Sequence, residues 1–234
     1  AIWFPGAVGC LMTPLRVDVT DRAGKVHSKS DWAKSEALGV NLAVKAREAL
    51  TKGEKIKAPT VSAWAKVIKL PVDNIMFQTV MGLKIFDRPT FDYNPNIPID
   101  KTNKPKIQTE IAVVRVGPVT FFSLPGEAAP ETLVGGFDGS KSLGAKLIDV
   151  NNKYPPPVAK APKGPYLKAL IPGKYKFFIG LGNDELGYIV PAYNFVLGSP
   201  AYLNQAPGDH YTETNSLGPD TETLLLKHYG DLLK

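Results

Sequence analysis

Acidic and phenolic side chains follow two apolar segments that end in glycine-rich turns. Glu127 comes directly after "VTFFSLPG", and "NDELGY", with Asp184, Glu185 and Tyr188, comes directly after "KFFIGLG". Open α/β sheets place their sites beyond the ends of their strands. Carboxylate oxygens are ligands that a cation such as Zn²⁺ accepts. These residues therefore indicate either ordinary turns at strand ends or a cluster of ligands.

Two further segments carry groups that could act on a substrate. Thr13 ends the glycine-rich "FPGAVGCLMTP", and His210 and Tyr211 stand in "GDHYTETNSLGP", just before the final predicted helix. Zinc in such surroundings would polarise a carbonyl group and lower the pKa of a bound water. The chain's histidines show no paired spacing such as H-x-H or H-E-x-x-H. A complete zinc site is therefore not visible in this chain by itself.

The same residues also have purely structural explanations. Glu127 fits as the first-turn acid of a helix, where the helix dipole favours negative charge. The others fit as turn, loop or rim residues: Thr13, Asp184, Glu185, Tyr188 and His210. Single residues therefore do not decide between the two interpretations.

Other common catalytic motifs are missing or incomplete. The chain has no G-x-S-x-G nucleophile elbow. In "GGFDGSKS", Ser140 occupies the position where a phosphate-binding loop needs a glycine before its lysine. The segment "GLGNDELG" has too few glycines in the right frame for dinucleotide binding.

Strands and helices alternate along the chain, which predicts an α/β class, with α+β as the alternative, and a mixed sheet flanked by helices. The clearest helix is predicted over 31–51, with a capping box at Ser28 and Asp31. Further helices are predicted over 73–86, shortly after 127, and over 219–233 with Pro219 at its first position. Strands are predicted within 1–18 and over 57–72, 108–117, 119–126 and 174–182. The proline-rich stretch 151–173 is predicted to be a surface insertion.

Composition limits the possible functions. The chain has 234 residues, 44% of them hydrophobic, which suffices for one sizeable core. Its net charge is +6, but the lysines are scattered and no nucleic-acid motif is present. A weakly basic face is compatible with peripheral contact with a membrane. The single cysteine, Cys10, excludes an internal disulfide without deciding the compartment. We expect a secreted, periplasmic or cell-surface protein.

The first residues have the pattern expected in the middle of a domain. "AIWFPGAVGC" has no initiator Met, no basic segment and no apolar signal region. We infer that the chain is a processed or truncated part of a longer precursor, and that a companion N-terminal polypeptide from that precursor is a partner.

Several motifs in order resemble the neutral/alkaline non-lysosomal ceramidase family, in its bacterial ceramidase-like branch. They are "TEIAVVRVGPVTFFSLPGE", "FFIGLGNDELGYIVP" and "YTETNSLGP", and the opening "FPGAVGCLMTP" resembles that family's glycine-rich segment. The resemblance is strongest over 108–127 and 176–219. It implies that residues 1–234 are the C-terminal portion of one larger catalytic domain.

The resemblance implies a zinc-dependent amidase that cleaves the N-acyl bond of sphingolipids. It makes Glu127 and Tyr188 metal ligands and places two further histidine ligands upstream of Ala1. It makes Tyr211 or His210 the residue that hydrogen-bonds the substrate, and it places Thr13 at the position of the family's serine. Asp184 and Glu185 are then expected to orient ligands or substrate.

The chain also departs from the family pattern. "GCLMTP" is one residue longer than the matching run, with Cys10 in place of an Asp, and Pro191 interrupts the segment after Tyr188.

Three hypotheses follow. The first is a zinc-dependent hydrolase of an N-acyl amide, from a lipid or a related substrate. The second is a non-catalytic binding or surface protein on the same scaffold. The third is a hydrolase with Thr13 or Cys10 as nucleophile.

Overall fold

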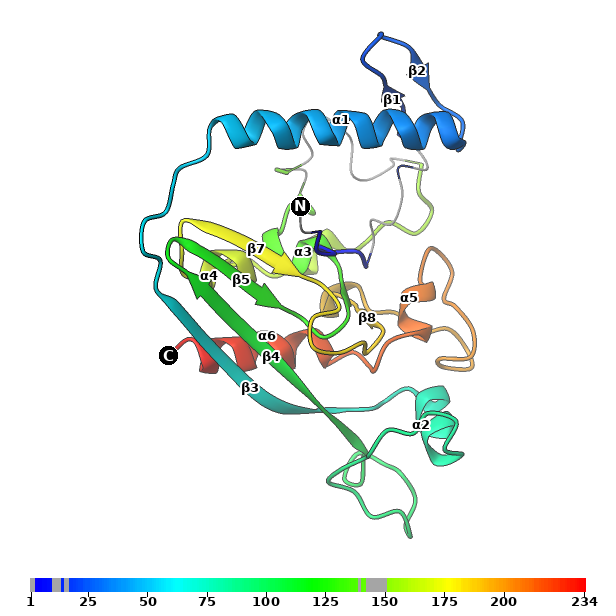
Figure 1. Cartoon of the computed structure of the whole chain (residues 1–234). Helices are drawn as coiled ribbons and strands as arrows, with labels where there is room; N and C mark the ends of the chain where they lie inside the picture. Colours follow the sequence, from blue (N-terminus) through cyan, green and yellow to red (C-terminus); the bar gives the residue numbers. More distant parts are fainter. Residues whose placement is uncertain (1–2, 10–13, 15–16, 139, 142–150) are drawn as a thin grey trace. The chain divides into compact units, whose positions relative to one another are not determined.

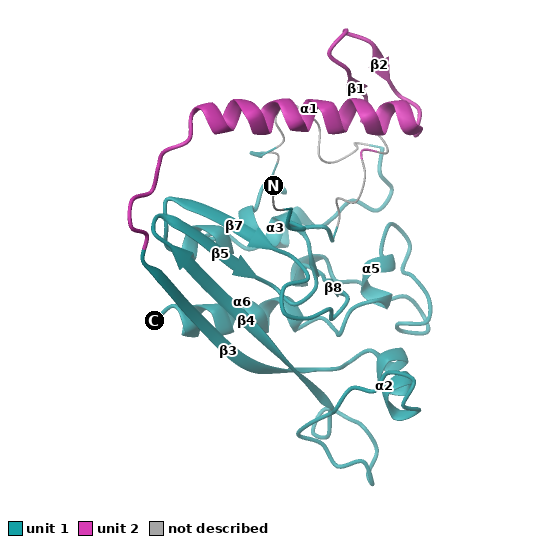
Figure 2. Ribbon diagram, in the orientation of Figure 1, with its two compact units in different colours: residues 1–10, 60–234 teal, residues 11–59 magenta. Residues whose placement is uncertain are grey.

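The computed structural model describes residues 3–9, 14, 17–138, 140–141 and 151–234. The chain divides into two compact units (Figure 2). The first contains Ala1–Cys10 with Thr60–Lys234, and the second contains Leu11–Pro59.

The second unit consists of a short hairpin and one long helix (Figure 1). Strands β1 (Val19–Thr20) and β2 (Val26–His27) pair antiparallel and precede α1 (Trp32–Thr51). Helix α1 lies where the sequence predicts it, but its N-cap is Asp31, whose carboxylate accepts from the backbone N–H of Lys34. The predicted capping box starting at Ser28 is therefore wrong, because the helix begins after Asp31, whose side chain caps one of the first free N–H groups, that of Lys34.

The first unit is built on a four-stranded sheet, here called the central sheet, with strand order β3-β4-β5-β7. Its strands are β3 (Val61–Pro71), β4 (Lys106–Val116), β5 (Val119–Ser123) and β7 (Tyr175–Ile179). The β3–β4 and β4–β5 pairs are antiparallel, whereas β5 and β7 are parallel. The predicted hairpin through Gly117 and Pro118 is thus confirmed. The fold is α/β with a mixed sheet, as the alternation of elements predicts.

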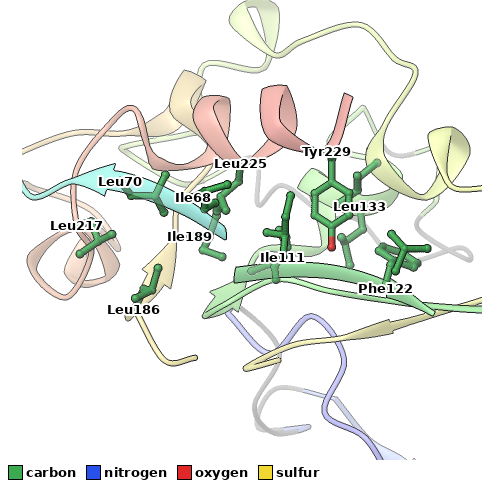
Figure 3. Close-up of a cluster of buried hydrophobic side chains, with 14 of the residues drawn as sticks. Ile68, Leu70, Ile111, Phe122, Leu133, Leu186, Ile189, Leu217, Leu225 and Tyr229 are labelled. Carbon is green, nitrogen blue, oxygen red and sulfur yellow. The ribbon is translucent and has the colours of Figure 1, made fainter. Parts of the chain in front are cut away.

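Helix α6 (Thr221–Leu232) packs its apolar side on the central sheet. Figure 3 shows Leu225 and Tyr229 pointing from α6 toward the strands. Tyr229 is fully buried, and its hydroxyl donates to the carbonyls of Ser123 and Ala112 and accepts from the N–H of Ser123. Because Ser123 ends β5, this contact fixes the chain just before Glu127. The main members of the core are Ile68, Leu70, Ile107, Ile111, Val113, Phe122, Leu124, Leu133, Leu167, Ile171, Leu186, Ile189, Leu217, Leu225 and Tyr229.

The remaining elements are short and connect the sheet to the candidate site. In chain order they are α2 (Ile75–Gly82), β6 (Glu127–Ala128), α3 (Pro130–Val134), η1 (Val158–Lys160), α4 (Leu167–Leu170), β8 (Tyr188–Ile189), η2 (Ala192–Asn194) and α5 (Tyr211–Thr214). Strands β6 and β8 pair with each other as a separate two-stranded sheet.

Three local predictions need correction. No strand forms within residues 3–9, 14 or 17–18, the described part of the predicted 1–18 segment. Pro219 precedes the N-cap of α6, which is Asp220. The stretch 151–173 is not wholly a surface feature, because Leu167 and Ile171 are buried in the core. Among the described helices, none combines the length and the apolar character that crossing a membrane requires.

Candidate functional site

Glu127 and Tyr188 are brought side by side by the pairing of β6 with β8. The strands are parallel, and Glu127 and Tyr188 are register partners. Register partners on adjacent strands project to the same face, with backbones about 4.8 Å apart. The carboxylate and the phenol therefore start from neighbouring positions, although 61 residues separate them in the sequence.

Glycines allow the two segments to approach this closely. A Cβ on Gly126 would lie 2.5 Å from the carbonyl oxygen of Gly187. Gly187 itself has a φ of +82°, and a Cβ there would clash with the carbonyl of Asn215. Only glycine satisfies both the left-handed conformation and the close contact. The glycines in "PGE" and "LGY" therefore set the position of Glu127 and Tyr188.

Tyr188 lies between β6 and the segment after α5. Its backbone N–H donates to the carbonyl of Asn215 at 2.9 Å. Its hydroxyl lies 3.2 Å from the hydroxyl of Tyr211, and the two rings pack edge to face with centroids 5.4 Å apart. Tyr211 is 36% exposed, so this pair faces solvent on one side. The site thus joins a carboxylate and two phenols.

The pKa values of the two glutamates near Tyr188 are raised. Burial raises the pKa of Glu127 above its ordinary value. Burial also raises the pKa of Glu185, and the charges of Glu127 and Asp184 raise it further, against a hydrogen bond from the N–H of Gly187. These shifts place Glu185 within electrostatic reach of Glu127. Negative charge is therefore concentrated beside Tyr188, an environment that favours a cation.

Asp184 is held by an arginine from a distant loop. Arg88 forms a bidentate ion pair with Asp184, with Nη1 at 2.9 Å from Oδ1, and its Nη2 also donates to the carbonyl of Gln108. Burial raises the pKa of Asp184, but the hydrogen bonds from Arg88 and from the N–H of Glu185 and the charge of Arg88 contribute to lowering it below its ordinary value. The carboxylate therefore anchors the turn that leads to Tyr188 rather than pointing a free charge into the site.

His210 and Tyr211 adjoin the site from α5. His210 is the N-cap residue of this helix, and its Nδ1 lies 2.7 Å from Oε1 of Glu213. Glu213 is 1% exposed. The ring of His210 is therefore fixed by a buried carboxylate, while the next residue, Tyr211, contacts Tyr188.

The structure brings together Glu127, Glu185, Tyr188 and Tyr211, and it places Asp184 and His210 at the edge of this group. Thr13 lies outside the described residues, so its predicted role stays a prediction. Sequence reasoning did not assign roles to Arg88 and Glu213. The spacing of three between His210 and Glu213 could have indicated their contact on a helix. No local pattern indicates the pairing of Arg88 with Asp184, which spans 96 residues.

Within the described part of the chain, no group of three or more His, Cys, Asp or Glu side chains is arranged to hold a metal ion. Comparison with protein-family models, with curated proteins and with solved structures gave no match.

Proposed function

We propose that the chain is part of a zinc-dependent hydrolase that cleaves an N-acyl amide bond, in a lipid or a related substrate. The observation that carries the proposal is the pairing of Glu127 with Tyr188, beside the hydroxyl of Tyr211. A carboxylate and a phenol at adjacent register positions supply two oxygen donors to one ion. The carboxylates of Glu127 and Glu185, near enough for the charge of Glu127 to raise the pKa of Glu185, support a cation there rather than an anion.

The donor set fits half of a zinc site. Zinc in proteins is usually held by three or four side chains. Glu127 and Tyr188 would hold it from this chain, and the resemblance to ceramidases supplies the expectation of histidines from upstream polypeptide. When bound, zinc supplies a Lewis acid that polarises the scissile carbonyl and makes water more acidic.

The residues of this chain then orient the substrate. Tyr211 can donate its hydroxyl proton to the carbonyl oxygen as negative charge develops there, because its partner Tyr188 can engage the metal instead. Hydrolysis forms a bond from the water oxygen to the carbonyl carbon and breaks the carbon–nitrogen bond, giving a carboxylic acid and an amine. Arg88 and Asp184 keep the turn that carries Tyr188 in place.

Hydrolysis of N-acyl amides of graded acyl length, with and without added zinc, tests the proposal. The sample is the full chain together with any polypeptide that native mass spectrometry finds bound to it. We expect zinc-dependent release of the amine, and a loss of at least about 100-fold in Glu127→Gln. Glu131→Gln, four residues along on α3, is the matched control and should retain activity.

Binding of the amides without turnover, in the presence of bound zinc, would instead identify a non-catalytic binding protein on this scaffold. Absence of both binding and turnover would remove the lipid amide as the ligand class. A secreted or cell-surface location, and peripheral contact with a membrane, remain part of the proposal because the expected substrate resides in membranes.

A further inference from the structure

Glu213 is a buried carboxylate with a complete set of hydrogen bonds. Its side chain is 1% exposed. Oε1 accepts from the backbone N–H of Val196 at 3.2 Å and lies 2.7 Å from Nδ1 of His210, and Oε2 accepts from the hydroxyl of Thr212 at 2.9 Å. Buried charges persist in proteins only when they are paired or hydrogen-bonded in this way.

The same oxygen of Glu213 joins the two ends of one loop. Val196 follows η2, and His210 precedes α5, so the segment between them is closed by Oε1. Gly208, with a φ of +104°, bends the chain next to the ring of His210, whose Cδ2 would lie 3.3 Å from a Cβ at that position. The ring is thus held between the carboxylate and the turn.

We propose that Glu213 is a positioning residue that fixes the tautomer of His210. A carboxylate can only accept hydrogen bonds, so the ring nitrogen that faces it must carry the proton. In the neutral imidazole this places the hydrogen on Nδ1 and leaves the lone pair on Nε2. An isolated histidine prefers the opposite tautomer, so the carboxylate reverses the intrinsic preference.

The consequence for chemistry rests on the proposed function. With its lone pair on Nε2, His210 can take a proton from water as the water oxygen bonds to the carbonyl carbon. The same proton passes to the amine nitrogen as the carbon–nitrogen bond breaks, so protons balance and His210 returns to its starting state. Tyr211, the residue after His210, contacts Tyr188, which is the proposed metal ligand.

Glu222, on helix α6, is also a buried carboxylate, but its hydrogen-bond partners differ in kind from those of Glu213. Glu222, 6% exposed, accepts from the hydroxyl of Thr132 at 2.5 Å and from the N–H of Ala192 at 2.8 Å. Neither the hydroxyl of Thr132 nor the backbone N–H of Ala192 is titratable. Glu222 therefore provides a matched control: the same residue type, also buried, without a histidine partner.

The test is nitrogen-15 NMR of the full chain, labelled at histidine and recorded above the pH at which imidazoles become neutral. The chain has three histidines, so His210→Gln assigns the signals. We expect His210 to be predominantly in the Nδ1–H form in the wild type. Glu213→Leu removes the acceptor that faces Nδ1 and should shift it to the Nε2–H form, whereas Glu222→Leu should leave it unchanged.

A wild-type spectrum dominated by the Nε2–H form of His210 would overturn the proposal, and this measurement leaves Glu213 itself unchanged. An unchanged tautomer in a folded Glu213→Leu protein would overturn it as well. In amide hydrolysis, the same variant should lower kcat by about 100-fold or more, with KM within about twofold.

The NMR result and the proposed function can fail separately. A tautomer that depends on Glu213, in a protein that hydrolyses no amide, would support the positioning role and reject the hydrolase. Amide hydrolysis by a protein in which the tautomer of His210 does not depend on Glu213 would support the hydrolase and reject the positioning role.

Discussion

The hydroxyl groups of Tyr188 and Tyr211 lie 3.2 Å apart, on rings that pack edge to face. Tyr188 comes from the two-residue strand β8, and Tyr211 begins α5, 23 residues later. The pair connects the residue proposed to hold the metal with the residue proposed to contact the substrate.

Tyr211→Phe removes one hydroxyl from the pair and keeps the aromatic contact. We expect zinc affinity to change by less than about threefold, because Tyr188 stays in place, and kcat to fall by about 100- to 1,000-fold, the usual effect of losing one transition-state donor. Metal titration and steady-state kinetics on the same sample check both values. Tyr175→Phe on β7, which removes an exposed hydroxyl away from the site, is the control. Loss of zinc with unchanged kcat in the remaining holoenzyme would reverse the assigned roles.

Arg88→Gln removes the ion pair that anchors the turn before Tyr188. The side chains of Arg88 and Asp184 are 28% and 19% exposed, so water replaces the lost hydrogen bonds only in part. We expect the free energy of unfolding at neutral pH to fall by about 1.5–3 kcal/mol. Urea denaturation measures the change, and Lys45→Gln, which breaks an exposed pair with Glu48, should have little effect.

The effect of Arg88→Gln should depend on pH. The pKa of Asp184 in the folded protein lies below its ordinary value of 3.8. A lowered pKa stabilises the fold above the ordinary value, and this contribution is lost as pH falls through the folded-state pKa. The difference in stability between the wild type and the variant should therefore stay constant at neutral pH and shrink below 3.8. A difference that grows on acidification would contradict the ion pair.

Glu222→Gln should show the opposite pH dependence. Burial raises the pKa of Glu222 above its ordinary value of 4.5, and this outweighs the hydrogen bonds from Thr132 and Ala192. The wild type therefore loses stability as pH rises from 4.5 through the folded-state pKa, whereas the amide does not titrate. As pH rises across this range, the denaturation midpoint of the wild type should fall relative to that of Glu222→Gln. A constant offset between the two proteins would show that Glu222 is not perturbed.

Tyr229→Phe tests the contact that fixes β5 in front of Glu127. The hydroxyl of this fully buried tyrosine bonds to Ser123 and Ala112. Removing it leaves backbone groups at the end of β5 without a partner, so we expect a loss of about 1–3 kcal/mol in the free energy of unfolding. Calorimetry checks the loss. Tyr166→Phe, whose hydroxyl donates to the carbonyl of Pro162 on the exposed surface, should cost much less.

The larger elements of the fold could be predicted from the sequence because their signals are local. Helix α1, the β4–β5 hairpin and α6 follow apolar periodicity and turn residues, and the structure places them close to the predicted bounds. Strand β3 is shorter than predicted, beginning at Val61. The end of the proline-rich stretch was misjudged because prolines suggest a surface, whereas Leu167 and Ile171 pack in the core.

The candidate site was only partly predictable. The polar residues after strands indicated Glu127 and Tyr188, but β6 and β8 have two residues each, too few to show any periodicity. Their register depends on Gly126 and Gly187, whose close contact appears only in three dimensions. Arg88 lies in a loop rich in proline and asparagine, and its pairing with Asp184 depends on the tertiary fold alone.

The most direct test locates zinc by anomalous diffraction at the zinc absorption edge, in crystals grown with excess zinc from the full chain together with any polypeptide that native mass spectrometry finds bound to it. The account predicts a peak within about 2.3 Å of both a carboxylate oxygen of Glu127 and the hydroxyl oxygen of Tyr188. Crystals of Tyr188→Phe should lose the peak or show it much weakened. Zinc bound elsewhere on the chain, with no density between Glu127 and Tyr188, would contradict the central claim.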